Sequence, residues 1–365
     1  NKSLKATSPN EIIASNGNGA GGGILLFQAA PSILNCKITD NEAGKAGGIY
    51  CMVTTEFPIS STNTASTISN CTIQNNHASM RGGGMQCDLD SHPELISCKF
   101  MNNTCDAKGG GLYNDFFCSP TLINCLFAGN TALRAGAMGN DGSSNPTLIN
   151  CTITDNYTTD VGAGIYTGSY NPDDAQSNQP TLINCIVYGN ETEWGGPADL
   201  RIWAMNYFFI DYSCIGIGFT SFGTGNVLSD PMFVDPDNGD YRLQSNSPCI
   251  NTGTSINAPI NDIDGNERDA SPDMGAYEYD AISEINCIQD MSSSLLVYPN
   301  PAEEQITIDG IENESYIYIY NLLGEPIVYM ENQTESLNIN IQSLPCGSYI
   351  IKTETGRSKI FFKSK

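Results

Sequence analysis

The chain has little charge, little basic character and almost no histidine. Only 15% of its 365 residues are charged, and acidic residues outnumber basic ones by 40 to 16, so the net charge is −24. Nucleic acid is therefore not expected as a partner, because neutralising phosphates needs a basic surface. No apolar run approaches the roughly 20 residues of a membrane helix, and we expect no transmembrane segment.

Two further absences narrow the chemistry. His77 and His92 are the only histidines, and no CxxC/His spacing occurs, which argues against a zinc site. The opening stretch, NKSLKATSPN, lacks the apolar core of a signal peptide, and we expect the chain to begin after a processed segment.

What the sequence does contain is an internal repeat. The unit C-x-[IFV]-x-x-N occurs six times, and a cluster of glycines with an apolar pair follows most copies. Three of the steps between copies are 27, 27 and 26 residues, which is too short for a propeller blade. The cysteines of the six copies are Cys36, Cys71, Cys98, Cys125, Cys151 and Cys185, and their asparagines are Asn41, Asn76, Asn103, Asn130, Asn156 and Asn190.

Each copy contains a strand pattern. In LINCTIT, Ile149, Cys151 and Ile153 alternate with Asn150 and Thr152, as in a strand with one buried face. One such strand cannot cover its own apolar face, whereas strands stacked at roughly 4.8 Å bury a continuous core. We therefore predict a parallel β-helix. The asparagines are expected in one column at a bend, where asparagine tolerates left-handed backbone, and the glycines at a second corner.

The cysteines divide into two groups. We interpret those of the repeat, with Cys214 as a candidate seventh, as small buried thiols that pack as apolar groups. In-register stacking sets their Cβ atoms about one rung apart, farther than the roughly 3.8 Å of a relaxed disulfide. Cys51 and Cys87 are a separate pair near a turn that can relax, and they are the first disulfide candidate.

Three acids also share the repeat register. Asp88, Asp115 and Asp141 each lie four residues after the last glycine of a cluster, or after its alanine equivalent. On adjacent rungs their carboxylates would raise one another's pKa or recruit a hard cation such as Ca²⁺, and plain solvation is the alternative. Two oxygen-rich loops, DPDNGD and DIDGN, are further calcium candidates or only shape turns, and their acids are Asp235, Asp237, Asp262 and Asp264.

Insertions between rungs all follow the apolar pair of a glycine cluster, so we expect them to project from one edge of the helix. The segments are Met52–Ser66, Asn114–Ser119 and Thr167–Gln179. They are either ordinary surface loops or a partner-binding ridge, because recognition concentrates on the loops of one face of a repeat array. Their aromatic side chains are Phe57, Phe116, Phe117 and Tyr170.

The rung pattern, with glycine clusters alternating with [IF]-x-x-N segments, resembles the repeats of polymorphic outer-membrane proteins and related bacterial surface β-helices. Further on, Ser229–Tyr279 contains SDPMF, GDYRL, SPCINTG, DIDGNER and GAYEY. This stretch resembles the terminal region of choice-of-anchor Q surface proteins. The resemblance implies that the stretch closes the β-helix and precedes a sorting signal.

The C-terminal stretch carries a second resemblance. YIYIY, LNINI and YIIKT alternate with period two, as in a small β-sandwich. The motif residues are Tyr298, Pro299, Asn300 and Pro301 of YPNP, Gly324 of NLLG, Leu344, Pro345, Gly347 and Tyr349 of LPCGSY, and the basic end at Lys363 and Lys365. Along its whole length this stretch resembles the type A C-terminal sorting domain of type IX secretion substrates. The resemblance implies passage through the type IX outer-membrane translocon, then removal of the domain or its use in surface attachment.

We therefore expect an all-β chain with four parts. They are a right-handed parallel β-helix over residues 1–226, a terminal or capping region over 227–280, a linker over 281–294 and an Ig-like β-sandwich, the sorting domain, over 295–365. The expected function is that of a secreted cell-surface protein, an adhesin or a structural protein. A surface glycan or another surface protein is the expected partner, and Ca²⁺ is the only cofactor considered.

A polysaccharide-binding or polysaccharide-degrading enzyme, a lyase or a hydrolase, is the rival. Such enzymes need clustered aspartates with Ca²⁺ and a basic residue, or paired carboxylates. The cations Arg81, Lys108 and Arg134 have no obvious carboxylate partner nearby in sequence, so we do not expect catalysis. Fold alone does not decide between these functions.

Overall fold

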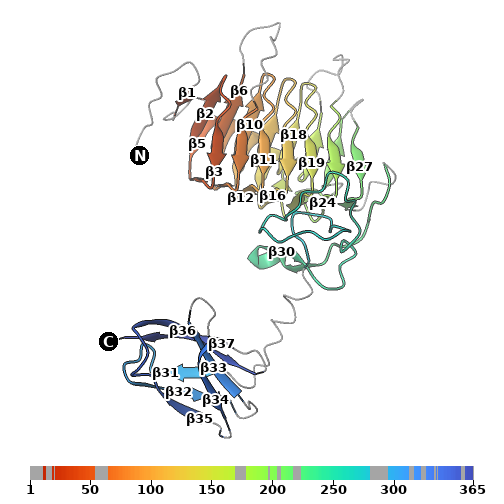
Figure 1. Cartoon of the computed structure of the whole chain (residues 1–365). Helices are drawn as coiled ribbons and strands as arrows, with labels where there is room; N and C mark the ends of the chain where they lie inside the picture. The colour runs from red at the N-terminus through yellow and green to blue at the C-terminus, as the bar shows by residue number, and fades with distance from the viewer. Residues whose placement is uncertain are drawn as a thin grey trace. The chain divides into compact units, whose positions relative to one another are not determined.

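The chain divides into two compact units, Asn1–Asp280 and Ala281–Lys365, seen in the computed structural model of Figure 1. Among the residues that the structure describes, no helix is long and apolar enough to cross a membrane. Those residues are 11–13, 19, 21–53, 65–168, 178–195, 198–203, 207–216, 223–279, 295–311, 316–321, 326–332, 334, 336–354 and 358–364.

The first unit is a parallel β-helix with four sheets, to which each turn of the chain adds short strands. Sheet I contains β1 (Glu11–Ile13), β2 (Ile24–Phe27), β6 (Ile49–Met52), β10 (Met85–Asp88), β14 (Leu112–Asn114), β18 (Met138–Asn140), β22 (Ile165–Thr167) and β26 (Leu200–Ile202). Sheet II contains β3 (Ser32–Leu34), β7 (Thr67–Ser69), β11 (Glu94–Ile96), β15 (Thr121–Ile123), β19 (Thr147–Ile149), β23 (Thr181–Ile183) and β27 (Phe209–Asp211).

The other two sheets follow in each turn. Sheet III contains β4 (Lys37–Thr39), β8 (Thr72–Gln74), β12 (Lys99–Met101), β16 (Leu126–Ala128), β20 (Thr152–Thr154), β24 (Ile186–Val187) and β28 (Cys214–Ile215). Sheet IV contains β5 (Glu42–Lys45), β9 (His77–Arg81), β13 (Thr104–Lys108), β17 (Thr131–Arg134), β21 (Tyr157–Thr158) and β25 (Glu191–Thr192). β1 pairs antiparallel with β2, whereas consecutive turns pair in parallel, as β15 does with β19.

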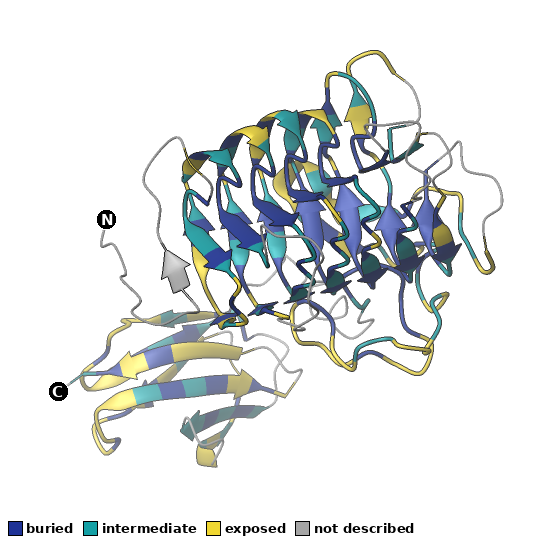
Figure 2. Cartoon of the chain, turned by 90° about the horizontal axis from the view of Figure 1, so that it is seen from above, coloured by how far each residue is buried: buried dark blue, intermediate teal, exposed yellow. Residues whose placement is uncertain are grey.

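The register stacks like side chains on one another. Leu148 pairs with Leu122 on one side and with Leu182 on the other, and Phe100 stacks on Phe127 with ring centroids 4.5 Å apart. These side chains belong to one hydrophobic core that extends through the turns, visible as the buried bands of Figure 2. The repeated phrase PTLIN is therefore one strand of sheet II with its leucine inside.

The predicted asparagine column is present. Asn130 accepts hydrogen bonds from the backbone N–H and the side-chain amide of Asn103, at 3.0 and 2.9 Å. Its own amide donates to Asn156 Oδ1 and to the Phe100 carbonyl, both at 2.9 Å. The same contacts join Asn41, Asn76, Asn103, Asn130, Asn156 and Asn190 in one ladder.

The backbone reason that the sequence suggested for this column is wrong. Left-handed φ falls on the residue before each ladder asparagine, as at Asn75 and Asn102, both with φ of 54°. The ladder asparagines instead point inward and satisfy buried backbone groups. At the last turn Asn190 donates to Asp199 Oδ1 at 2.7 Å, and an aspartate suits that place because it only has to accept.

Glycines form the corner between sheets IV and I, as predicted. Gly109 has φ of 74°, a conformation that costs glycine little. At Gly110 a Cβ atom would lie 2.4 Å from the Gly136 carbonyl oxygen of the next turn. The glycine cluster therefore reflects both left-handed backbone and close approach of neighbouring turns.

Residues 227–279 begin at the end of the β-helix, where Val227 pairs in parallel with Cys214, and then cover one side of it. This segment contains β29 (Phe233–Asp235), the 3₁₀ helix η1 (Pro236–Asn238) and β30 (Asp240–Leu243). Tyr241 and Tyr277 pack on Leu126, which faces outward from sheet III. Gly275 N–H donates to the Asn184 carbonyl at 2.7 Å. The segment thus lies along sheet III and the corner before it.

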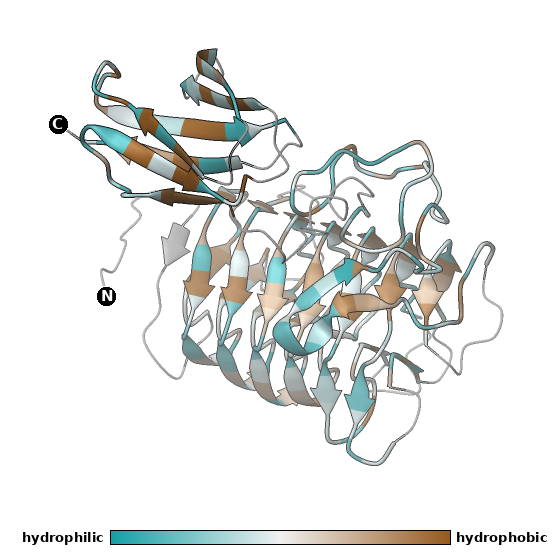
Figure 3. Cartoon of the chain, turned by 90° about the horizontal axis from the view of Figure 1, so that it is seen from below, coloured by the Kyte–Doolittle hydropathy of each residue, from teal (hydrophilic) through white to brown (hydrophobic). Residues whose placement is uncertain are grey.

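The second unit is an antiparallel β-sandwich with its own core. One sheet has the order β31 (Leu296–Tyr298), β32 (Gln305–Asp309) and β35 (Ser336–Asn340). The other has the order β34 (Pro326–Glu331), β33 (Tyr316–Asn321), β36 (Gly347–Thr353) and β37 (Ser358–Lys363). Ile306 and Ile308 from the first sheet meet Ile317 and Ile319 from the second in one cluster, and apolar residues alternate along these strands in Figure 3.

Candidate functional site

The three predicted acids lie in one row on the outer side of sheet I. Asp88 ends β10, and Asp115 and Asp141 directly follow β14 and β18. Asp115 N–H donates to the Cys87 carbonyl and Asp141 N–H to the Asn114 carbonyl, which sets the three on consecutive turns. Each is only 4% exposed, so plain solvation does not describe them.

A row of basic residues faces the acids. Lys45, Arg81, Lys108 and Arg134 pair in register at the ends of the strands of sheet IV. Each forms an ion pair with an acid of the following turn: Lys45 with Asp88 at 3.7 Å, Arg81 with Asp115, Lys108 with Asp141 at 2.7 Å, and Arg134 with Asp160 at 2.5 Å. Arg81, Lys108 and Arg134, which have no carboxylate partner nearby in sequence, therefore have one on the following turn.

Tyrosines lie between the two rows. Tyr50 donates to Asp88 Oδ2 at 2.7 Å, and Tyr113 donates to Asp141 Oδ2. The Tyr113 side chain is fully buried under the Arg81 guanidinium, 5.3 Å from its ring. Burial, opposed by Arg81 and reinforced by the neighbouring acids, raises the pKa of Asp115 to about 6. The acids, cations and tyrosines of the two rows thus pair mostly with one another.

The calcium hypothesis gains no support from the other acids. Asp262 Oδ1 accepts from the backbone N–H groups of Asp264 and Asn266, at 2.9 and 2.8 Å. Asp264 lies 3.4 Å from Lys99, and Asp235 accepts from Asn238 at 2.8 Å, while Asp237 is exposed. These acids shape turns. Within the described ranges no group of three or more His, Cys, Asp or Glu could hold a metal ion.

Cys51 and Cys87 do not form the predicted disulfide. They pair in register on β6 and β10, and both are free, buried thiols. Adjacent parallel strands hold the two Cβ atoms about 4.8 Å apart, and no turn relaxes that spacing. Cys214 is likewise not the seventh member of the repeat column, because Ser213 takes that position and its Oγ accepts from Cys185 N–H at 2.9 Å.

The insertions connect sheet I to sheet II, and we call this place the loop edge (residues 89–93, 115–120, 141–146, 203 and 207–209 of the described chain). Phe116 is 46% exposed there, and Phe117 is partly exposed. Both have left-handed backbone, with φ of 46° and 66°, which is costly for bulky residues. Phe57 and Tyr170 lie outside the described residues.

The last turn of the β-helix exposes aromatics that the sequence analysis missed. Trp203 and Phe209 are both 51% exposed at the loop edge, and Tyr207 packs edge-on against Phe209 with centroids 5.2 Å apart. The remaining tryptophan, Trp194, is 79% exposed at the corner between sheets IV and I. The available signal was that both tryptophans of the chain lie in the turn where the repeat degrades.

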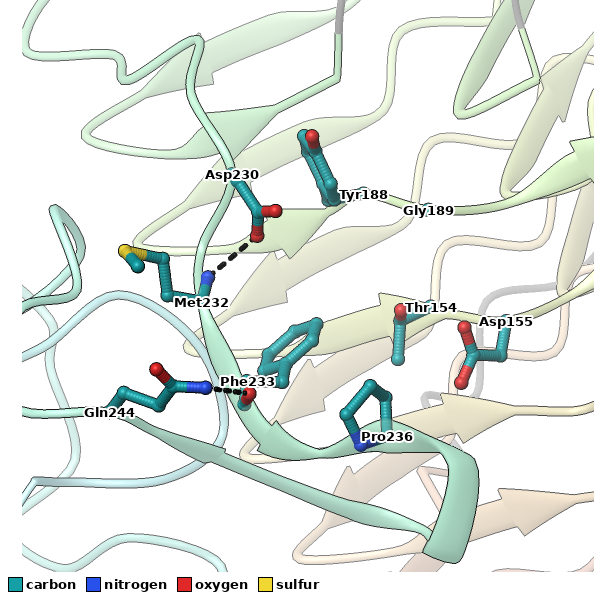
Figure 4. Close-up of a pocket in the computed structure, with 9 residues that line it drawn as sticks. All are labelled: Thr154, Asp155, Tyr188, Gly189, Asp230, Met232, Phe233, Pro236 and Gln244. Atoms are coloured by element: carbon teal, nitrogen blue, oxygen red, sulfur yellow. Dashed lines mark hydrogen bonds between the residues drawn. The ribbon is translucent and has the colours of Figure 1, made fainter.

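A cavity of about 280 Å³ lies between the corner that follows sheet III and the β29–β30 hairpin (Figure 4). Its lining residues are Thr154, Asp155, Tyr188, Gly189, Asp230, Met232, Phe233, Pro236 and Gln244. No basic side chain lines it. The sequence analysis named Asp230, Met232 and Phe233 only as part of SDPMF and predicted no cavity there.

The sorting motif ties the start of the sandwich to its last strand. Asn300 Oδ1 accepts from Phe362 N–H at 2.9 Å, and Asn300 Nδ2 donates to the Ile360 carbonyl at 3.1 Å. Pro299 and Pro301 both follow cis peptide bonds, and Tyr298 donates to Asp309 at 2.6 Å.

The second motif, LPCGSY, contacts the same last strand, β37, from β36. Tyr349 donates to the Pro345 carbonyl at 2.7 Å and stacks on Phe361, while Leu344 is buried in the sandwich core. Gly347 pairs with Lys363, whose ammonium donates to the Ser364 carbonyl at 2.7 Å. Gly324 and Lys365 lie outside the described residues.

Comparisons with known proteins agree with this architecture. Residues 59–250 match the family model for the right handed beta helix region, and residues 296–364 match that for the secretion system C-terminal sorting domain. No curated protein matches the chain. A solved structure titled "Crystal structure of pectate lyase Pel9A" is similar at 14% identity and a TM-score of 0.37, over 72% of this chain and 70% of that one. At that score the likeness carries no argument about activity.

Proposed function

The chain belongs to the right-handed β-helix family and is exported by type IX secretion to the cell surface or beyond it, and on this premise we propose that it is an adhesin. Its partner is a surface glycan or another surface protein bound at the loop edge. The observation that supports this function is the set of exposed aromatics on the last turn, Trp203, Tyr207 and Phe209, with Phe116 three turns earlier along the same edge. Tryptophan and tyrosine dominate the energetics of binding surfaces, and a folded protein rarely exposes them together without a use.

The acid row on sheet I and the basic row on sheet IV favour a scaffold. Their carboxylates are paired with lysine, arginine or tyrosine of neighbouring turns, so the rows hold the turns together. A binding platform needs such rigidity, because a preorganised surface loses less entropy on association.

The test compares the full-length chain with a Trp203→Ala/Phe209→Ala variant. We expect at least tenfold weaker binding to glycan arrays and to surface-protein extracts, with unchanged display on cells. Met80→Ala/Leu133→Ala removes two similarly exposed apolar side chains on sheet IV and is the matched control. If both variants bind as strongly as the unmodified chain, the loop edge is not the adhesive surface.

The alternative, a polysaccharide lyase or hydrolase, is favoured by one observation. Asp115 combines a pKa of about 6 with a neighbouring Arg81 and two further carboxylates, which is the kind of environment that tunes an acid or base. Incubation with acidic and neutral polysaccharides, followed by assay of reducing ends and unsaturated uronates, separates the two functions. Enzymatic release of products that Asp115→Asn abolishes would establish the alternative.

A further inference from the structure

The cavity of Figure 4 lies apart from the loop edge and is lined by two aromatic side chains, two carboxylates and no basic side chain. It lies where the β29–β30 hairpin covers the turns of Thr154 and Tyr188. Its volume of about 280 Å³ is just below the roughly 300–1,000 Å³ usual for ligand pockets, so it suits a small ligand. The Phe233 ring projects into its middle, between Asp230 on one side and Asp155 on the other.

The hairpin fixes the wall that carries Phe233. Gln244 Nε2 donates to the Phe233 carbonyl at 2.7 Å, and Gln244 N–H donates to the Met232 carbonyl at 2.9 Å. Asp230 Oδ1 accepts from Met232 N–H at 2.8 Å, which sets the direction of that carboxylate. Phe233 also packs edge-on against Tyr241, with centroids 5.7 Å apart. The aromatic and one acid are thus held before any ligand arrives.

The opposite wall has a space that a glycine leaves. Gly189 has φ of 73° and stands at the same corner position as Asn75, Asn102 and Asp155 of earlier turns. A Cβ atom at Gly189 would lie 3.5 Å from Thr154 Oγ1 and 4.0 Å from Asp155 Oδ1. A larger side chain at position 189 would occupy the part of the cavity next to Thr154 Oγ1 and Asp155 Oδ1.

The charge of the cavity selects among sugars. Two carboxylates line it, and Asp237 and Glu191 add negative potential at Asp155. With no basic side chain in the lining, a uronate or a phosphate would be repelled. Hydroxyl groups, in contrast, donate readily to carboxylates in charge-assisted hydrogen bonds.

We propose that this cavity is a binding subsite for one neutral hexose unit. The ring packs on Phe233, and its hydroxyls donate to Asp155 and Asp230. The proposal does not rest on the adhesin function, because the cavity and the loop edge are different surfaces of the β-helix.

The test uses the full chain and methyl glycosides of glucose, galactose and mannose, with methyl galacturonide as the acidic probe. Saturation-transfer NMR should show binding of at least one neutral glycoside and none of the galacturonide. Gly189→Asn should abolish it, because the corner accepts asparagine in other turns and the new amide fills the cavity. Asp155→Asn should weaken binding about tenfold.

Gly195→Asn is the matched control, because Gly195 also has left-handed φ and nothing lies within 4 Å of its Cβ position. Its binding should equal that of the unmodified chain, and melting curves should show all three variants folded. The proposal fails if no neutral glycoside binds, if the galacturonide binds equally well, or if folded Gly189→Asn retains binding.

Discussion

At the scale of single residues, satisfaction of buried hydrogen bonds determines which positions tolerate change. Replacing Asn130 with alanine would leave Asn103 N–H, the Asn103 amide and the Phe100 carbonyl without their partner. Each buried group left unsatisfied costs about 1–3 kcal/mol, so we expect at least about 3 kcal/mol lower free energy of unfolding. Urea denaturation measures it. Asn75→Gly is the control, and an equal loss there would contradict the ladder's role, because Asn75 only supplies left-handed backbone.

The acid row predicts a pH dependence of stability. The pKa of Asp115 is about 6 in the folded chain, above its ordinary value of 3.8, so folding favours the protonated form. The contribution is complete below pH 3.8 and is lost as pH rises through about 6, by on the order of 3 kcal/mol. Urea titrations between pH 4 and 7 should therefore show a steeper fall in stability for the unmodified chain than for Asp115→Asn. Parallel curves would show that Arg81 fully compensates the burial.

Removal of calcium is the third test at this scale. Asp88, Asp115 and Asp141 have cationic partners, and Asp262 is saturated by backbone N–H groups, so no carboxylate of these sites needs a metal to balance it. We expect the same melting transition with and without excess chelator, and no bound calcium by elemental analysis. A chelator-dependent drop in melting temperature would restore the cation hypothesis.

The register of these residues could be predicted from the sequence, but their partners could not. The asparagine ladder and the acid row follow the repeat length, which periodicity reveals. The ion pairs cross from one turn to the next, so that Arg81 and Asp115 are 34 residues apart and look isolated in the chain. The sequence analysis placed the left-handed corner at Asn76, whereas the structure has it at Asn75. The error arose because asparagine occupies both positions.

At the scale of elements, the cysteine column shows how stacking protects reactive groups. Cys151 donates to the Leu122 carbonyl at 3.5 Å and accepts from Cys125 N–H at 3.4 Å, fully buried. Cys36 and Cys346 are the exposed thiols of the described chain. Cys36 is the one column member that is not buried as predicted, so native alkylation followed by peptide mass spectrometry should modify Cys36 and Cys346 and spare Cys51, Cys87 and the other five column cysteines until denaturant is added. Recovery of a Cys51–Cys87 linked peptide would overturn the free-thiol assignment.

Element placement is where sequence reasoning was least informative. Strand existence and order in the β-helix follow from alternation and repeat length. The segment with Tyr241 and Tyr277 was expected to close the helix; it pairs with the last turn at Val227, and most of it covers sheet III, which was not expected. A resemblance gives order along the chain and says nothing about which face an irregular segment covers. The cavity beside Phe233 results from that placement, so it too was beyond reach of the sequence.

At the scale of the whole molecule, the two units have separate cores and separate tasks. The core of the β-helix runs through stacked turns, and the core of the sandwich lies between its two sheets. Export could be predicted because sorting domains carry short motifs in a fixed order, here YPNP and LPCGSY. The ligand could not, because recognition depends on exposed groups such as Trp203 and Phe209, which obey no repeat.

This separation gives the last prediction, the deletion of residues 295–365. The remaining β-helix should fold, because each turn contacts chiefly its neighbours and the β-helix has a hydrophobic core of its own. Circular dichroism should show β-structure, and the melting transition should change little. In cells the truncated chain should stay within the envelope, since the sorting domain carries the address. Asn300→Ala is the finer variant, because it removes the two bonds from the YPNP segment to β37 while leaving the sandwich core intact. Surface display of the truncated chain at the normal level would show that the sorting domain is dispensable for export.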